Sequence, residues 1–396
     1  MFKKRGTLET GFLSKYRTAM AATTLIGTIV GAGILAIPYV VSQSGFLIGF
    51  IVTVVLGLAF LLLNLMVGEI VLRTKQQQQL PGYIGKYLGK WGKQLMMFSL
   101  LLSIYGALTA YLIGEGETLH TLFGFGTPMA FSLIFFAVTF LIIYRGVKAA
   151  GKAELIFISL LLLVVVLIGI FSYKDIRAEN LSTINISKFF IPYGVILFAF
   201  IGYPAIPEIQ EVLEDEKKKM KKVIIIGSLL PIVLYVLFSL FVVGIVSLDN
   251  FEALEPNQRI ATIALSIYSS PMLGAFANLI AVLAMFTSFL TLGIALLEIY
   301  KYDYYLSNTK ALLLTFSIPL LITLLKLSTF ISVIAVTGAV AGGLEGILII
   351  LSYWKAKLLG ERKPEYSLKS HKVLGTLLIV MFAFGIIYQI YIHFFQ

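Results

Sequence analysis

The sequence predicts an all-α membrane protein of about eleven transmembrane helices. Of its residues 59% are hydrophobic and 13% are charged, and apolar runs of 18 residues or more recur along the whole chain. The mean hydropathy is +0.96, whereas about a quarter of the residues of an ordinary soluble domain are charged. Each run is long enough to cross a hydrocarbon core of about 30 Å as a helix. We therefore expect the lipid bilayer to surround most of the chain.

The apolar runs define the predicted spans in order. They cover residues 18–42, 45–72, 94–113, 127–144, 153–173, 190–212, 223–247, 271–300, 309–326, 329–353 and 373–394. The first run is too long for a signal peptide and lacks a small-residue cleavage site, so we expect it to remain as a span. The loops are too short to fold separately, which predicts one transmembrane domain over residues 1–396.

Lys and Arg are distributed unevenly between alternate loops. If the amino terminus is cytoplasmic, 26 of the 31 lie in cytoplasmic segments. The other five are Lys174, Arg177, Lys188, Arg259 and Lys326. Basic residues resist translocation, so we expect the amino terminus inside and the carboxyl terminus outside a cell (plasma) membrane. A nucleic-acid partner is not expected from the net charge of +11, because such a partner requires basic residues gathered on one accessible face.

Residues that carry catalytic or cofactor chemistry are scarce. The absence of cysteine excludes disulfides, Cys-ligated zinc, iron–sulfur clusters and thiol catalysis. The histidines His120, His371 and His393 lie far apart in the sequence and form no metal or triad constellation. A channel would require a ring of polar residues that lines a pore, usually formed by oligomerisation. We expect no enzyme and no cofactor, and we expect a monomer.

Two predicted spans contain residues that interrupt a helix at mid-membrane. Residues 27–38 hold three glycines within seven positions followed by a proline, and residues 198–208 hold two prolines three positions apart. Glycine holds a helix poorly, and proline removes a backbone donor. Backbone groups freed in lipid need partners in protein, ligand or cavity water. We expect helices 1 and 6 to be unwound here, with close packing through Gly27 and Gly31 as the alternative for the first run.

The two interruptions fall in the first and sixth spans, which start from opposite sides of the membrane. They relate residues 18–173 and 190–353 as inverted five-helix repeats, with 373–394 as an extra helix. Corresponding breaks in two such halves point to a transporter's binding site at the midplane. Half-helix amino termini attract anions and unwound carbonyls attract cations, so a zwitterionic amino acid suits the site. Its expected contacts are the amides around Gly31, Ala32 and Gly33 and the carbonyls around Ala199, Phe200 and Gly202.

Three stretches resemble the amino acid/auxin permease family, a branch of the amino acid, polyamine and organocation superfamily. They are GTIVGAGILAIP (27–38), YGALTAY (105–111) and FAFIGYPAIPE (198–208). The resemblance covers the first ten spans and implies the LeuT-type fold and transport of amino acids by alternating access. By position it assigns substrate contacts to Gly31, Ala32, Gly33, Phe200, Gly202 and Tyr203, with Tyr105 and Tyr111 as an aromatic wall. Because neither break contains a charged residue, we expect neutral L-amino acids as substrates.

The resemblance also implies coupling to sodium or protons. Thr287 and Ser288 match two hydroxyls that bind sodium in related transporters, and hard oxygen ligands suit this ion. The remaining implied ligands are the carbonyls of Gly27, Val30 and Ala284. Hydroxyls in membrane helices also commonly bond the carbonyl four residues back. Residues 156–170 lack a lysine that replaces sodium in some proton-coupled relatives. We expect Na⁺ symport, with proton symport, exchange or amino-acid sensing as alternatives.

Three carboxylates lie in or near the predicted spans: Glu69, Glu208 and Glu345. Carboxylates in lipid are costly and usually mark pathways or relays. The resemblance matches Glu69 to a position that steadies the unwound part of span six. Glu345 is a candidate proton relay, with a neutral, hydrogen-bonded structural carboxyl as the alternative. A metal-ion transporter of this architecture would use an Asp and an Asn in the first break and a Met in the second, which this sequence lacks.

Overall fold

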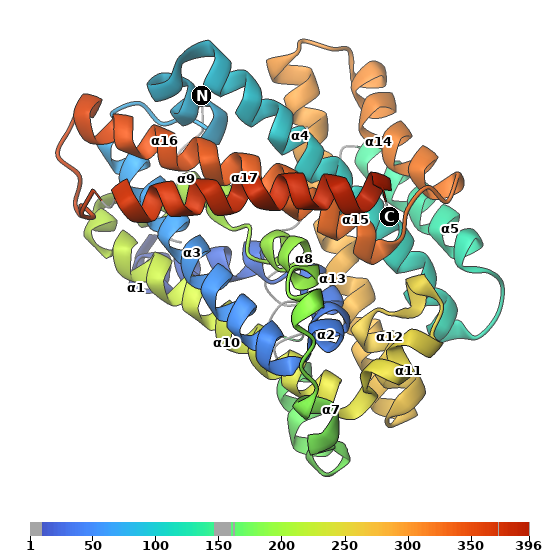
Figure 1. The fold of residues 1–396 in the computed structure, drawn as a ribbon. Helices are drawn as coiled ribbons and strands as arrows, with labels where there is room; N and C mark the ends of the chain where they lie inside the picture. Colours follow the sequence, from blue (N-terminus) through green and yellow to red (C-terminus); the bar gives the residue numbers. More distant parts are fainter. Residues whose placement is uncertain (1–9, 146–159, 161–162, 371, 396) are drawn as a thin grey trace.

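The computed structural model describes residues 10–145, 160, 163–370 and 372–395, and this part of the chain is helical without strands (Figure 1). Within it, seven helices are long and apolar enough to cross a membrane. An eighth span consists of α1 (Thr10–Ile29) and α2 (Gly33–Ser44), which are bent by 53° at their junction. The shorter apolar helices α5 (Pro128–Tyr144) and α14 (Asn308–Leu324) coincide with the fourth and ninth predicted spans. The all-helical prediction is confirmed, while residues 153–159 and 161–162 of the predicted span at 153–173 lie outside the described residues.

The remaining helices that fall within the predicted spans differ in length. They are α3 (Phe46–Arg73), α4 (Leu80–Phe123), α8 (Ile191–Ala199), α9 (Ile206–Leu213), α10 (Met220–Val246), α13 (Pro271–Glu298), α15 (Phe330–Thr337), α16 (Gly343–Leu359) and α17 (Lys372–Phe395). Two π-helical turns, η6 (Ile299–Asp303) and η7 (Gly338–Gly342), extend α13 and join α15 to α16. Short helices occupy the loops: η1 (Tyr173–Asp175), α7 (Ala178–Ser182), η2 (Ile186–Lys188), η3 (Tyr203–Ala205), η4 (Glu214–Lys219), α11 (Leu248–Ala253), η5 (Pro256–Gln258) and α12 (Ala261–Tyr268).

Helix α4 is longer than the span predicted at 94–113. It begins at Leu80, bends at Gly89, where φ is 78°, and continues to Phe123. The polar residues Glu115 and Glu117 lower the local hydropathy, which is why the sequence prediction ends before them. A helix satisfies its own backbone hydrogen bonds, so isolated polar side chains do not end it in a membrane. Both glutamates are buried inside the molecule instead.

Corresponding helices of the two halves pack against each other. Helix α2 lies against α8, α3 against α10, and α4 against α13. Figure 1 shows α2 and α8 together near the centre, with α3 and α10 on one side and α4, α5 and α14 on the other. Helix α17 runs along the outside, against α16. This arrangement fits two five-helix repeats plus one additional helix, and it brings the two interrupted spans together.

The loop after α10 is tied to α2. Arg259 donates a hydrogen bond to the Tyr39 hydroxyl at 2.9 Å, and its guanidinium lies 5.1 Å from the centre of the Tyr39 ring. Phe251 of α11 packs edge-on against the same ring. These contacts hold α11 and α12 over the end of α2.

Candidate functional site

The first interruption, residues 30–32, leaves backbone donors without acceptors. The regular helical pattern ends where the Val30 amide donates to the Ile26 carbonyl at 2.7 Å. The chain resumes with two tighter bonds to the carbonyl three residues back, from the Ile34 amide to Gly31 at 3.4 Å and from the Leu35 amide to Ala32 at 3.0 Å. Among the described residues, the amides of Ala32 and Gly33 have no backbone acceptor. Because α2 begins at Gly33, these amides form its positive end, which suits an anionic group.

The second interruption, residues 200–202, separates α8 from η3 and α9. The chain turns here with the Ala205 amide bonded to the Gly202 carbonyl at 3.1 Å. Pro204 and Pro207 occupy the first turns of η3 and α9, where a missing N–H removes no helical hydrogen bond. The predicted unwinding of helices 1 and 6 is therefore confirmed.

The two interruptions lie directly against each other. A β-carbon added at Gly33 would lie 2.8 Å from the Ala199 Cα, so α2 approaches α8 closely only because this position is glycine. A β-carbon at Gly202 would lie 2.5 Å from the Ile29 side chain at the end of α1. The hydroxyl of Tyr235 on α10 lies 2.7 Å from the Ile29 carbonyl and 2.9 Å from the Ala199 carbonyl. Tyr235 thus joins the carbonyl ends of α1 and α8, which carry partial negative charge.

Gly31 borders space beneath Tyr111 of α4. Among the described residues, a β-carbon at Gly31 would meet one group, the Tyr111 hydroxyl, at the ordinary contact distance of 3.6 Å. Gly31 is partly exposed, whereas Val30 and Ala32 beside it are buried. A small ligand that contacts the free amides of the first interruption would therefore lie between α2 and α4.

Aromatic rings form the wall behind the second interruption. The Phe200 ring lies 5.0 Å from that of Tyr235 and 6.4 Å from that of Phe60, measured between ring centres. Tyr203 stacks on Phe60 at 6.0 Å. The Phe200 and Tyr203 side chains thus pack into the core between α3 and α10, and their backbone borders the interruption.

Glu345 connects the second interruption to α4. Its carboxylate accepts hydrogen bonds from Tyr203 at 2.5 Å and from Ser103 at 3.0 Å, and the side chain is fully buried. It lies just beyond the π-helical turn η7, a distortion common near functional sites. Glu345 is therefore coupled by direct contact to the unwound segment, as a relay or a structural carboxyl would be.

The structure does not bring Tyr105 to this site. Its hydroxyl lies 2.6 Å from that of Tyr300 and donates to the Leu314 carbonyl at 3.0 Å, between the ends of α13 and α14. Six positions along a helix turn the side chain by roughly 240°, so Tyr105 and Tyr111 cannot share one face. Its assignment to the aromatic wall is corrected accordingly.

Glu69 is also placed differently from the role implied by the resemblance. Its carboxylate binds Arg73 at 2.8 Å, Lys357 at 3.0 Å, Ser367 at 3.1 Å and the Leu368 amide at 2.7 Å. These groups belong to α3, to α16 and to the loop before α17. We call them the Glu69 cluster. The carboxylate ties that loop to the bundle rather than steadying the unwound part of span six.

The proposed sodium ligands are not joined in this structure. Thr287 donates to the carbonyl of Ala284 at 3.0 Å, the local bond common for hydroxyls in membrane helices. Its oxygen keeps lone pairs that can bind a cation. No hydrogen bond between described residues links Thr287 or Ser288 to Gly27 or Val30. Glu208 is exposed on α9, away from the contacts described above.

Two residues of this region escaped the sequence interpretation. Tyr235 lies in a uniformly apolar span, and nothing in the local pattern distinguishes it from an aromatic core residue. Glu115 follows Tyr111 by one helical turn, and that spacing is a signal that could have been used had the third span not been ended too early.

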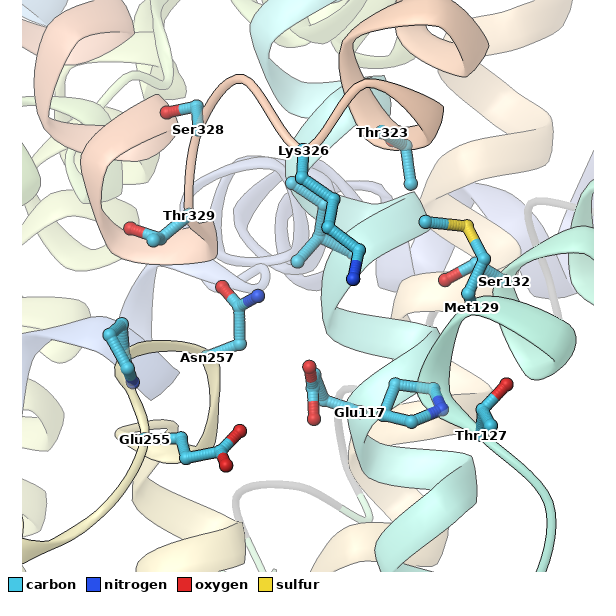
Figure 2. A pocket seen from close by; sticks show the side chains of 13 residues that line it. Glu117, Thr127, Met129, Ser132, Glu255, Asn257, Thr323, Lys326, Ser328 and Thr329 are labelled. Atoms are coloured by element: carbon cyan, nitrogen blue, oxygen red, sulfur yellow. The ribbon is translucent and has the colours of Figure 1, made fainter.

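A separate cavity of about 370 Å³ lies between α4, α5, η5 and the loop after α14. Figure 2 shows Glu117, Asn257 and Lys326 pointing into it from three of these elements. None of its lining residues belongs to either interruption. We therefore treat it as distinct from the site at the interruptions.

The helical bundle with its paired interruptions has the LeuT-type fold. Its fold resembles the crystal structure of MhsT in complex with L-phenylalanine, with a TM-score of 0.67, 16% identity and coverage of 96% of this chain and 98% of that one. The chain belongs to the tryptophan/tyrosine permease family, because the sequence model of that family matches residues 15–392. This membership corrects the amino acid/auxin permease resemblance, while the LeuT-type fold is confirmed.

Two bacterial amino acid transporters are similar to the chain over most of its length. The chain is 25% identical to tyrosine-specific transport system 1 of Haemophilus influenzae over 389 residues, which cover 92% of this chain and 94% of that protein. It is 24% identical to glutamine transporter 2 of Aliivibrio fischeri over 339 residues, which cover 81% of this chain and 84% of that protein. The family is one of permeases and not of enzymes.

Proposed function

We propose that this protein is a secondary active transporter that moves neutral L-amino acids across the plasma membrane by alternating access. The observation that carries the proposal is the meeting of two interrupted helices. Free amides at Ala32 and Gly33 face one part of the site, and the carbonyl ends of α1 and α8 meet at Tyr235 nearby. The region thus offers partial positive and partial negative charge without a formal charge in either interruption, which suits a neutral zwitterion.

Different residues would bind the carboxylate and the ammonium group of the amino acid. The carboxylate binds the amides of Ala32 and Gly33, and the Tyr111 hydroxyl lies over Gly31 where it can donate to the same group. The ammonium lies toward the carbonyl ends near Ile29 and Ala199. Both contacts are largely main-chain, so they recognise the part that all amino acids share. Tyrosine is the first substrate to test, because the similar proteins include a tyrosine transport system.

A cation gradient is the proposed driving force, and two cations have candidate sites. Sodium would use Thr287 and Ser288 with the carbonyls of Gly27, Val30 and Ala284. Thr287 bonds local carbonyls of its own helix here, and its oxygen keeps lone pairs that can bind the ion. Protons would use a buried carboxyl, and the contact of Glu345 with Tyr203 favours this second candidate.

The test is uptake of labelled tyrosine and glutamine into liposomes that contain the purified protein. Separate samples receive a sodium gradient, a proton gradient or neither. Accumulation above the external concentration under one gradient supports secondary transport and names the cation. If neither amino acid enters under any condition, and neither exchanges with internal amino acid, the proposed function is wrong.

A further inference from the structure

We propose that Glu115 binds the coupling proton during transport. The proposal rests on the proposed function and identifies the group that would link a proton gradient to amino-acid movement. It starts from one observation: Glu115 is completely buried, and neither of its carboxylate oxygens has a hydrogen-bond partner among the described residues. It is unlike Glu69 and Glu345, whose carboxylates both have partners.

Among the described residues, the Glu115 carboxylate has no hydrogen-bond partner. The neighbouring Gly114 faces Phe330 of α15 and Met285 of α13, and Gly116 faces Ser132 of α5. Helices α5 and α15 contain no charged residue, and α13 contains one, Glu298, at its far end. On α4 itself, the titratable neighbours are Tyr111, Glu117 and His120. Of the other helices packed against α4, α14 carries Lys310 near its start, and α16 carries Glu345, Lys355 and Lys357.

An ionised carboxylate in such a place costs several kcal/mol, because its lost hydration is not offset. A proton removes that charge and needs little space. Since buried polar groups normally have partners, an unpartnered one requires an explanation in terms of a ligand or a function. A group that must take up a cation to remain buried, and that ionises when hydrated, is suited to carry a proton across.

The position of Glu115 links it to the substrate. Tyr111 and Glu115 are four positions apart on α4, so their side chains lie on the same face one turn apart, and Ser103 lies about two turns before Tyr111. Ser103 binds Glu345, and Tyr111 lies at Gly31. Glu115 therefore lies one turn from the residue that borders the substrate space, with its β-carbon about 5–6 Å from that of Tyr111. If α2 moves relative to α4 during transport, the hydration of the substrate space and of Glu115 would change together.

The cycle follows from this geometry. With the site open to the outside, water reaches Glu115 and its carboxylate takes up one proton from the external solution. The neutral acid becomes buried again as the amino acid is enclosed. When the site opens to the cytoplasm, water returns and the proton leaves, so one proton crosses with the substrate and no other reactant is needed.

The experiment compares wild type with Glu115→Gln and Glu117→Gln in sodium-free liposomes. Glutamine has nearly the shape of glutamate but binds no proton. Glu117 is a matched control, because it is on the same helix two positions away and points into the cavity of Figure 2. Two activities are measured with labelled tyrosine: accumulation driven by an inward proton gradient, and exchange against internal tyrosine without a gradient across a series of pH values.

We expect Glu115→Gln to exchange tyrosine at every pH but to lose accumulation, so that internal tyrosine does not exceed the external concentration. Its exchange should also lose the pH dependence of wild type. Glu117→Gln should keep both activities. Normal accumulation by Glu115→Gln would overturn the proposal, as would wild-type accumulation that does not depend on the proton gradient. Loss of exchange together with accumulation in Glu115→Gln would assign a structural role instead. Failure of wild type to exchange any neutral amino acid would refute the transport function itself.

Discussion

Glu69 and Glu115 are equally buried, yet their surroundings are opposite. Glu69 binds two cations, a hydroxyl and a backbone amide, whereas Glu115 has no partner among the described residues. Removing one partner from a buried ion pair is costly because the other charge is left uncompensated. A fully satisfied carboxylate is therefore part of the scaffold. A buried carboxylate without partners instead needs a ligand that binds reversibly, such as a proton. Reversible proton binding near the interruptions could couple a proton gradient to transport.

The largest expected effect is that of Gly33→Val on the central region. The new side chain would enter the Ala199 backbone, where even a β-carbon lies at 2.8 Å, so α2 must move away from α8. We expect tyrosine uptake to be abolished although the protein still reaches the membrane. Uptake at the wild-type rate would show that the close contact of the two interruptions is not needed for transport.

Glu69→Ala should affect stability rather than transport. It leaves Arg73 and Lys357 without their buried partner, so we expect the free energy of unfolding to fall by about 3–5 kcal/mol. Thermal unfolding of the purified protein in detergent measures this. Among the molecules that remain folded, the apparent affinity for tyrosine should be that of wild type. A large change in affinity without a loss of stability would erase the contrast between the two regions.

Tyr235→Phe removes the hydroxyl that joins the carbonyl ends of α1 and α8. A net hydrogen bond contributes about 1 kcal/mol, so we expect the apparent affinity for tyrosine to weaken by about fivefold to tenfold. Tyr105→Phe is the matched control, because it removes a bonded tyrosine hydroxyl outside the site. Equal effects of the two substitutions on affinity would contradict the placement of the site.

The smallest effect concerns Glu361, in the loop that the Glu69 cluster fastens. Hydrogen bonds from Lys86 and from the Lys75 amide lower the pKa of its exposed carboxyl. Because this pKa is lower in the folded than in the unfolded protein, the interaction stabilises the fold above the unfolded value and is lost as pH falls through the folded one. Glu361→Gln should therefore lower the unfolding temperature slightly at neutral pH and not in acid. A difference that persists in acid would exclude this origin.

Hydropathy and helix breakers predicted most of the architecture because the bilayer imposes simple rules. Residues 27–38 and 198–208 revealed both interruptions because each holds several helix-disfavouring residues close together. A single proline did not suffice, since Pro38, Pro231 and Pro319 lie inside continuous helices. The faces of helices were harder to predict. Tyr105 and Tyr111 occur in one motif, but only the rotation of α4 places one at Gly31 and the other at α14.

Contacts between distant segments were beyond the local pattern. Glu69 is 288 positions before Lys357, and its partners could not be identified from a run of sequence around it. Glu115 was missed because its own polarity ended the predicted third span before it. The family, too, required comparison of the whole chain, because the three short motifs cover only a small part of the match over residues 15–392.

Binding of labelled tyrosine to purified Gly31 variants tests the central claim most directly. The β-carbon of Gly31→Ala fits at 3.6 Å from the Tyr111 hydroxyl, whereas the side chain of Gly31→Leu would fill the space beneath it. The account predicts saturable binding to wild type and to Gly31→Ala, and its loss in Gly31→Leu while the protein remains folded. Unchanged binding to Gly31→Leu would contradict a substrate site at the two interruptions.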